Sequence, residues 1–168
     1  MPEIHILCIE DEPDVLDAVL RDLAPFEEKF TLTGAADAAE AREILEGLDP
    51  ENDKVGLIFC DHIMPGQRGI DLLIALKKEN LQPLEHTRKV LFTGQADHAD
   101  TIQAINEAGI DRYLAKPWEV DELRSLTRKL LTEFVIAARI PPLPYMAVLD
   151  SARLAEAIHD RDEFNEAG

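Results

Sequence analysis

The chain has 168 residues, of which 46% are apolar, and its 34 acidic residues exceed its 17 basic residues to give a net charge of −17. This length is enough for one domain whose core buries roughly 70% of the surface that the unfolded chain would expose. The negative charge disfavours direct binding to nucleic acid or to an anionic membrane, whose phosphates would be repelled, and it suits a protein partner or a bound cation.

Short apolar runs alternate along the chain with segments of helical periodicity. The predicted strands cover residues 4–10, 29–34, 54–60, 89–94 and 110–116. The predicted helices cover residues 11–23, 37–48, 69–79, 100–109 and 119–139, and the sequence IPPLP at 140–144 must end the last of them. Strands and helices in this alternation predict a doubly wound α/β fold, with a parallel sheet covered on both faces.

The two cysteines and the first residues indicate a cytoplasmic protein. Cys8 and Cys60 lie in apolar strand-like runs without further ligands at a metal-binding spacing, so both are predicted to be buried free thiols. No apolar run approaches the ~20 residues of a membrane span, and the start MPEIHILCIEDEP lacks the basic segment of a signal peptide.

Polar side chains stand at the carboxyl ends of four predicted strands. These residues are Glu10, Asp11, Asp61, Thr93 and Lys116. Ligands of doubly wound sheets bind beyond these strand ends, so the side chains are expected to share one pocket. Neighbouring carboxylates repel each other, and Mg²⁺ relieves the repulsion while taking oxygen ligands. A carboxylate can also attack a phosphoryl group, whose other oxygens then need a hydroxyl and an ammonium group as donors.

Four motifs in this order resemble the receiver domain of two-component response regulators, over residues 3 to 135. They are IEDEP, CDHIMPGQRG, LFTGQAD and YLAKPW. The resemblance implies a flavodoxin-like sheet of five parallel strands in the order 2-1-3-4-5, with five helices. It also implies that Asp61 accepts a phosphoryl group from a histidine kinase or a phosphotransfer protein.

The resemblance assigns roles to the other residues of the pocket. Mg²⁺ would be bound by Glu10, Asp11, Asp61 and the backbone carbonyl of Ile63. The phosphoryl group would contact Thr93 and Lys116, the switch would consist of Thr93 and Tyr113, and the peptide bond between Lys116 and Pro117 would be cis. The chain would then be a phosphoacceptor rather than an enzyme with a separate substrate. Phosphorylation would change the surface formed by the fourth helix, the fifth strand and the fifth helix.

For several residues near the site, the sequence leaves two interpretations open. Tyr113 is either the switch aromatic or a half-buried strand residue. His62 is either a side chain at the rim of the site or a contact of the phosphoryl group or of a partner. Ile63 and Gln95 flank the pocket, and we hypothesise that they tune the lifetime of the phosphoryl group.

Residues 136–168 extend beyond the receiver, which we place at residues 1–135. The last receiver helix outruns the family pattern, and Leu131, Phe134, Val135 and Ile136 are expected to be exposed on a monomer. A short amphipathic helix is predicted from Asp150 or Ser151 onward. The extension is either a frayed linker or a docking element, with a homodimer through the C-terminal helices as one possibility.

Other functions remain as alternatives. The chain is compatible with a receiver fragment of a larger regulator, such as a cyclic-di-nucleotide phosphodiesterase or a hybrid kinase. A phosphatase with an aspartyl nucleophile would need a second acid two residues later, where Ile63 stands. A flavin or nucleotide carrier would need a glycine-rich loop after the first strand, and acids occupy that place. The sequence identifies neither the kinase nor the output.

Overall fold

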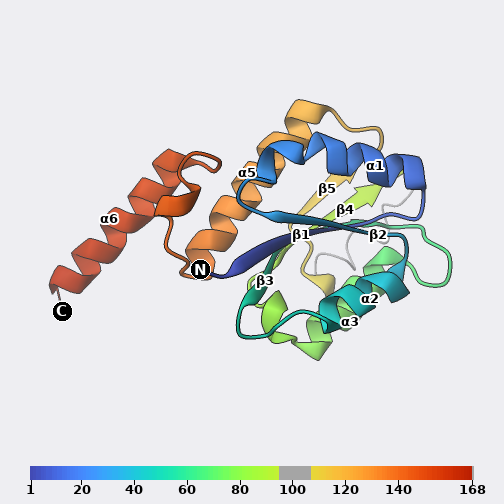
Figure 1. The fold of residues 1–168 in the computed structure, drawn as a ribbon, viewed down its shortest axis with the longest axis horizontal. Coiled ribbons are helices and arrows are strands. Elements are labelled where there is room, and N and C mark those ends of the chain that lie inside the picture. The colour runs from blue at the N-terminus through green and yellow to red at the C-terminus, as the bar shows by residue number, and fades with distance from the viewer. Residues whose placement is uncertain (95–106, 168) are drawn as a thin grey trace.

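The computed structural model describes residues 1–94 and 107–167 and shows a parallel sheet between two layers of helices (Figure 1). The strands are β1 (Glu3–Ile9), β2 (Thr31–Ala35), β3 (Asp53–Asp61), β4 (Arg88–Thr93) and β5 (Arg112–Ala115). Their order is β2-β1-β3-β4-β5 and every neighbouring pair is parallel, which confirms the predicted flavodoxin-like fold. The helix predicted over 100–109 lies largely outside the described residues.

Helices α1 and α5 cover one face of the sheet, and α2 and α3 cover the other (Figure 1). Their bounds are α1 Pro13–Asp22, α2 Ala38–Glu46, α3 Gly69–Glu79, α5 Val120–Ala137 and α6 Ser151–Ala167. Asp37 begins α2 as its N-cap, because its carboxylate accepts a hydrogen bond from the amide of Glu40 at 2.8 Å. In the described part of the chain, no helix combines the length and apolar character that crossing a bilayer requires.

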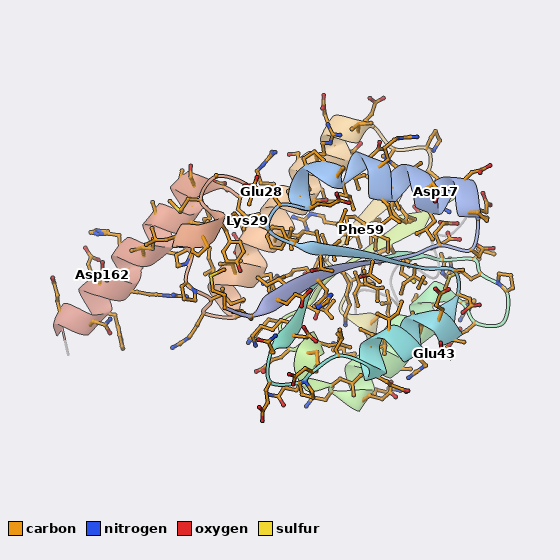
Figure 2. All side chains as sticks on the ribbon, in the orientation of Figure 1. Asp17, Glu28, Lys29, Glu43, Phe59 and Asp162 are labelled. Atoms are coloured by element: carbon orange, nitrogen blue, oxygen red, sulfur yellow. The ribbon has the colours of Figure 1, made fainter. Side chains whose placement is uncertain are left out.

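The core has two halves, one on each face of the sheet. Phe59 belongs to the half under α1 and α5 and lies in the interior, whereas Asp17, Glu43 and Asp162 point outward from their helices (Figure 2). The other half lies under α2 and α3. The central strands β1, β3 and β4 therefore bury both of their faces, which is why they read as continuous apolar runs rather than as alternating patterns.

Helix α5 approaches the sheet closely at Gly56 of β3. A Cβ atom at this position would lie 3.0 Å from Leu131 and 3.2 Å from Phe134, so the missing side chain makes room for the helix. Leu131, Phe134 and Val135 are buried, and Ile136 is half-buried. The prediction that these four residues form an exposed face was therefore wrong, because β3 and the C-terminal extension cover them.

The extension after α5 folds back and joins the core under α1 and α5. The buried residues that it contributes are Ile140, Tyr145, Leu149 and Leu154. The ring of Tyr145 stacks on Phe30 at a centroid distance of 5.5 Å. Asp150 caps α6 by accepting from the amide of Arg153 at 3.1 Å. With the apolar face of α5 covered within one chain, the reason for a homodimer through this face no longer holds.

Both cysteines are buried free thiols, as predicted. Cys8 lies on β1 and Cys60 lies on β3, in neighbouring strands. Burial away from water raises the pKa of both thiols, that of Cys8 to about 12. Neither thiol is therefore a reactive nucleophile at neutral pH.

Asp53 at the start of β3 gives a prediction about acid stability. Its carboxylate accepts a hydrogen bond from the amide of Asp49 at 2.8 Å and lies 3.2 Å from Nε2 of His5. The Asp49 amide first, and then His5, lower the pKa of Asp53 in the folded state. A lowered pKa stabilises the fold above the unfolded value near 3.9, and this contribution disappears as the pH falls through the lower folded value.

We expect Asp53→Asn to lower the free energy of unfolding by about 1 kcal/mol at pH 7, because the neutral amide can still accept the hydrogen bond but loses the extra strength of a charged acceptor. The difference between the two proteins should shrink toward pH 3. Urea unfolding at both pH values measures it. A difference that stays constant across this range would contradict the assignment.

Candidate functional site

The predicted pocket forms at the carboxyl edge of the sheet. Glu10 and Asp11 follow β1, Asp61 is the last residue of β3, and Lys116 follows β5 directly. The amide of Lys116 donates to the carbonyl of Thr93 at 3.1 Å, which holds the ends of β4 and β5 side by side. Because the sheet is parallel, residues up to 106 positions apart in sequence reach the same edge.

Lys116 connects two of the acids. Its Nζ atom donates to Oε2 of Glu10 at 2.6 Å and to Oδ1 of Asp61 at 2.9 Å. The Glu10 side chain is fully buried, and that of Asp61 is nearly so. The ring of Phe92 lies below the ammonium group, with its centroid 6.0 Å from Nζ. A single cation is therefore shared by two buried carboxylates.

Keeping these acids ionised in a buried site costs free energy. Burial raises the pKa of Glu10 and of Asp61, and the hydrogen bonds from Lys116 oppose this shift. The charge of Asp61 raises the pKa of Glu10 further, and Asp11 does the same to Asp61. Burial alone would lower the pKa of Lys116, but its bonds to Glu10 and Asp61 raise the value overall. More positive charge at this site would stabilise the ionised acids.

The three carboxylates fit a divalent cation. One oxygen from each of Glu10, Asp11 and Asp61 lies within 4.8 Å of the others. In a Mg²⁺ octahedron with bonds of ~2.1 Å, opposite ligands lie about 4.2 Å apart and adjacent ones about 3.0 Å apart, so the three oxygens would have to draw closer together to share one ion. Hard oxygen donors and an excess of negative charge are what Mg²⁺ requires. The ligand role predicted for the Ile63 carbonyl stays a prediction.

Thr93 and Tyr113 lie on one face of the sheet. Thr93 pairs in register with Ala115, and Tyr113 pairs with Leu91, two residues before Thr93. Side chains alternate along a strand, so the two residues point to the same side. Tyr113 is half-buried against the core under α2 and α3, and this burial raises its pKa. The geometry is compatible with a role in which the ring responds to the hydroxyl of Thr93.

Two features of the site were missed by sequence reasoning. Trp118 stacks on Phe92 at 5.1 Å and donates from Nε1 to Oδ2 of Asp22 at 3.0 Å, which ties the loop after Lys116 to α1. Gly69, the first residue of α3, lies so close to β3 that a Cβ atom would be 1.9 Å from the carbonyl oxygen of Asp61. The sequence held a signal for the contacts of Trp118, because this residue belongs to the YLAKPW motif. No local pattern marks the close approach of Gly69 to Asp61.

The flanking residues differ in their positions. His62 is buried, with its carbonyl accepting from the amide of Gly69 at 2.8 Å, so its prediction as a rim side chain was wrong. The side chain of Ile63 is 63% exposed. Gln95 lies outside the described residues. The peptide bond between Lys116 and Pro117 is cis.

Known proteins similar to this chain include transcriptional regulatory proteins. The family model for the response regulator receiver domain matches residues 6–128. The hydrogenase transcriptional regulatory protein HoxA of Cupriavidus necator is 33% identical over 124 residues, which are 74% of this chain and 23% of HoxA. The regulatory protein TorR of the torCAD operon of Escherichia coli K12 is 33% identical over 138 residues, 82% of this chain and 54% of TorR. The chain therefore spans only part of these relatives.

Solved structures agree with this assignment. The signal receiver domain of an HD domain-containing protein from Pseudomonas fluorescens Pf-5 superposes with a TM-score of 0.70 at 27% identity, covering 84% of this chain and 96% of that one. The acids after β1 and at the end of β3 and the lysine after β5 all fall within the matched region. The chain belongs to the response regulator receiver domain family of two-component signalling.

Proposed function

We propose that Asp61 accepts a phosphoryl group from a histidine kinase or a phosphotransfer protein in a Mg²⁺-dependent reaction. The observation that carries this proposal is the shared contact of Lys116 with Glu10 and Asp61, beside a third acid, Asp11. This arrangement brings three acids and a lysine to one edge of the sheet, where they would supply a nucleophile, metal ligands and a positive charge. It is an arrangement for transferring a charged group rather than for acid–base chemistry on a neutral substrate.

The chemistry follows from the groups present. A carboxylate oxygen of Asp61 attacks phosphorus, the bond between phosphorus and the donor histidine nitrogen breaks, and that nitrogen takes a proton. The product is an acyl phosphate on Asp61. Lys116 is placed to donate to a phosphoryl oxygen, and the hydroxyl of Thr93 would be a second donor. Bound to Glu10, Asp11 and Asp61, Mg²⁺ would neutralise charge that builds up on the phosphoryl oxygens.

Phosphorylation would act as a switch through Thr93 and Tyr113. When Thr93 moves toward the phosphoryl group, the space beside it opens for the ring of Tyr113 on the same face of the sheet. The surface that changes would include β5, α5 and the predicted fourth helix. Most residues of this fourth helix lie outside the described ranges. In this mechanism the phosphoryl group selects one of two pre-existing states.

The output is proposed from the relatives. HoxA and TorR are named as transcriptional regulatory proteins, and both are longer than this chain. We propose that this receiver likewise controls a separate partner or an attached output domain. A larger regulator with a cyclic-di-nucleotide phosphodiesterase or hybrid-kinase part would use the receiver in the same way. A phosphatase is less well supported, because the exposed apolar Ile63 occupies the position of its general acid.

Intact mass measurement tests the acceptor. After incubation with acetyl phosphate and Mg²⁺, we expect the chain to gain the mass of one phosphoryl group, and we expect neither Asp61→Asn nor the EDTA-treated chain to gain it. Asp17→Asn, at an exposed acid of α1, is the matched control and should be phosphorylated like the parent chain. Phosphorylation of Asp61→Asn at the parent rate would refute the assignment. Rapid turnover of a phosphate ester would instead identify a phosphatase.

A further inference from the structure

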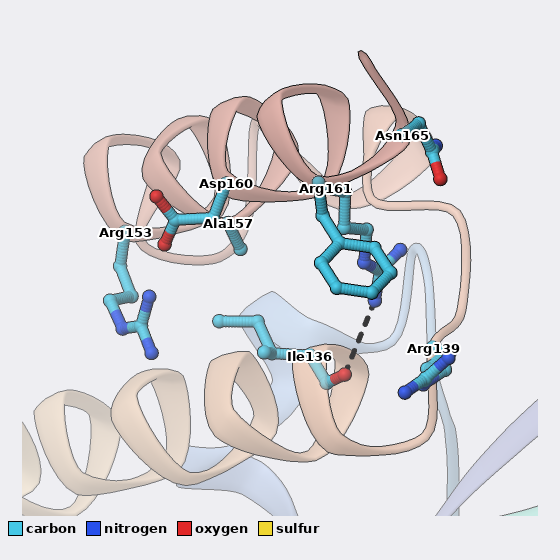
Figure 3. Close-up of a pocket in the computed structure, with 8 residues that line it drawn as sticks. Ile136, Arg139, Arg153, Ala157, Asp160, Arg161 and Asn165 are labelled. Atoms are coloured by element: carbon cyan, nitrogen blue, oxygen red, sulfur yellow. Dashed lines mark hydrogen bonds between the residues drawn. The ribbon is translucent and has the colours of Figure 1, made fainter. Parts of the chain in front are cut away.

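A second site lies between α5 and α6 and shares no residue with the acidic pocket (Figure 3). It is a cavity of about 620 Å³, within the range of roughly 300–1,000 Å³ typical of small-molecule sites. Its lining consists of Ile136, Arg139, Arg153, Ala157, Asp160, Arg161, Phe164 and Asn165. The cavity exists only because the extension folds back beside the end of α5.

Three guanidinium groups face this cavity on a chain whose net charge is −17. Arg153 is paired through Nε with Glu133 at 3.2 Å. The side chain of Arg139 makes no hydrogen bond or ion pair within the described ranges 1–94 and 107–167. Its backbone is left-handed, with φ at 57°, where the chain leaves α5. Arg139 is exposed, so its unpaired guanidinium can reach an anion in the cavity and bind it through its planar set of donors.

Arg161 removes an obstacle to anion binding. The carbonyl end of a helix carries partial negative charge and would repel a phosphate. Arg161 reaches from α6 to this end of α5 and donates from Nη2 to the carbonyl of Ile136 at 3.3 Å (Figure 3). Its positive charge offsets the helix end, and a guanidinium has donors beyond the one used here. Asp160 is the only acid among the lining residues.

The rest of the lining is apolar and includes an exposed aromatic ring. Ala157 is buried and Ile136 is half-buried, whereas Phe164 is 81% exposed. A large aromatic side chain left in water beside cationic groups offers a flat surface on which another ring can stack. We propose that the cavity binds a small organic phosphate with an aromatic ring, of the class of a nucleoside monophosphate. Arg139 and Arg161 hold its phosphate, and its ring stacks against Phe164.

Calorimetric titration of the full chain with AMP in the presence of EDTA tests this proposal, with inorganic phosphate and adenosine as separate probes. AMP should bind more tightly than either part alone. Arg139→Ala should weaken AMP and phosphate binding about tenfold, which is 1.4 kcal/mol, because a charge-assisted contact is lost. Asp160→Asn should tighten both about threefold by removing a repulsive charge. Phe164→Ser should weaken AMP and adenosine and leave inorganic phosphate unchanged.

Arg21→Ala is the matched control, because Arg21 is an exposed arginine on α1 outside the cavity, and it should bind AMP like the parent chain. Circular dichroism shows whether each variant is folded. The proposal is overturned if AMP at millimolar concentration does not bind the parent chain, or if Arg139→Ala and Arg21→Ala bind it equally. Unchanged AMP binding by Phe164→Ser would overturn the aromatic class of ligand. None of these outcomes depends on phosphorylation of Asp61.

Discussion

Replacing Gly69 with alanine is expected to destabilise the fold by about 3 kcal/mol, the upper part of the usual range for overpacking. The added Cβ atom would lie 1.9 Å from the carbonyl oxygen of Asp61 and 2.9 Å from Sγ of Cys60. The obstacle is backbone rather than a flexible side chain, so α3 or the end of β3 must move. Urea unfolding followed through the single tryptophan, Trp118, measures the change.

The same substitution should slow phosphorylation of Asp61 at least tenfold. A shift at the end of β3 moves the acceptor relative to Lys116, and a misplacement of ~1 Å can reduce a rate by about 100-fold. Gly94→Ala is the control, since a Cβ atom there meets no atom of the described residues within 4 Å. Equal stability and equal phosphorylation rates for the two variants would show that the close approach of Gly69 to Asp61 is wrong.

Replacing Tyr145 with alanine is expected to lower the free energy of unfolding by about 3–4 kcal/mol, as for other large buried aromatic residues. Tyr145 is 1% exposed and stacks on Phe30, which belongs to the receiver part of the chain. The neighbouring Leu143 is 74% exposed, so Leu143→Ala should change stability by less than about 0.5 kcal/mol. Urea or thermal unfolding of both variants makes the comparison.

The same reasoning predicts the effect of removing residues 140–168. The shortened chain would expose the core surface that Ile140, Tyr145, Leu149 and Leu154 cover, beside Phe134 and Val135 of α5. We expect it to aggregate or to lose its cooperative unfolding transition. If the shortened chain unfolds as cooperatively and as stably as the full one, and Tyr145→Ala is no worse than Leu143→Ala, the extension is no part of the core.

The architecture could be predicted because the alternation of apolar runs and helical periodicity leaves few topologies. Helix α3 was placed at its observed bounds. The other boundaries differ by a few residues, as at β5, which begins at Arg112 rather than at residue 110. Such differences arise because strand ends depend on which neighbour supplies hydrogen bonds, and this is a property of the sheet.

The meeting of Glu10, Asp61 and Lys116 could also be predicted. In a parallel sheet all carboxyl ends share one edge, so the position of a residue along its strand is enough to place it in the pocket. The burial of His62 could not be predicted in this way. Its position depends on the close packing of Gly69 against the end of β3, which links residues on two different elements.

The sequence by itself determined the order of elements, the class of fold and the set of polar residues at the strand ends. Each of these follows from local periodicity and from the geometry of parallel strands. Only the tertiary structure decided which surfaces are covered. An apolar stripe such as the one on α5 shows that something must bury it, but the stripe is the same whether a second copy or the chain's own extension does so. The packing of Tyr145 on Phe30 makes that choice, because it brings together residues more than a hundred positions apart that no local pattern connects.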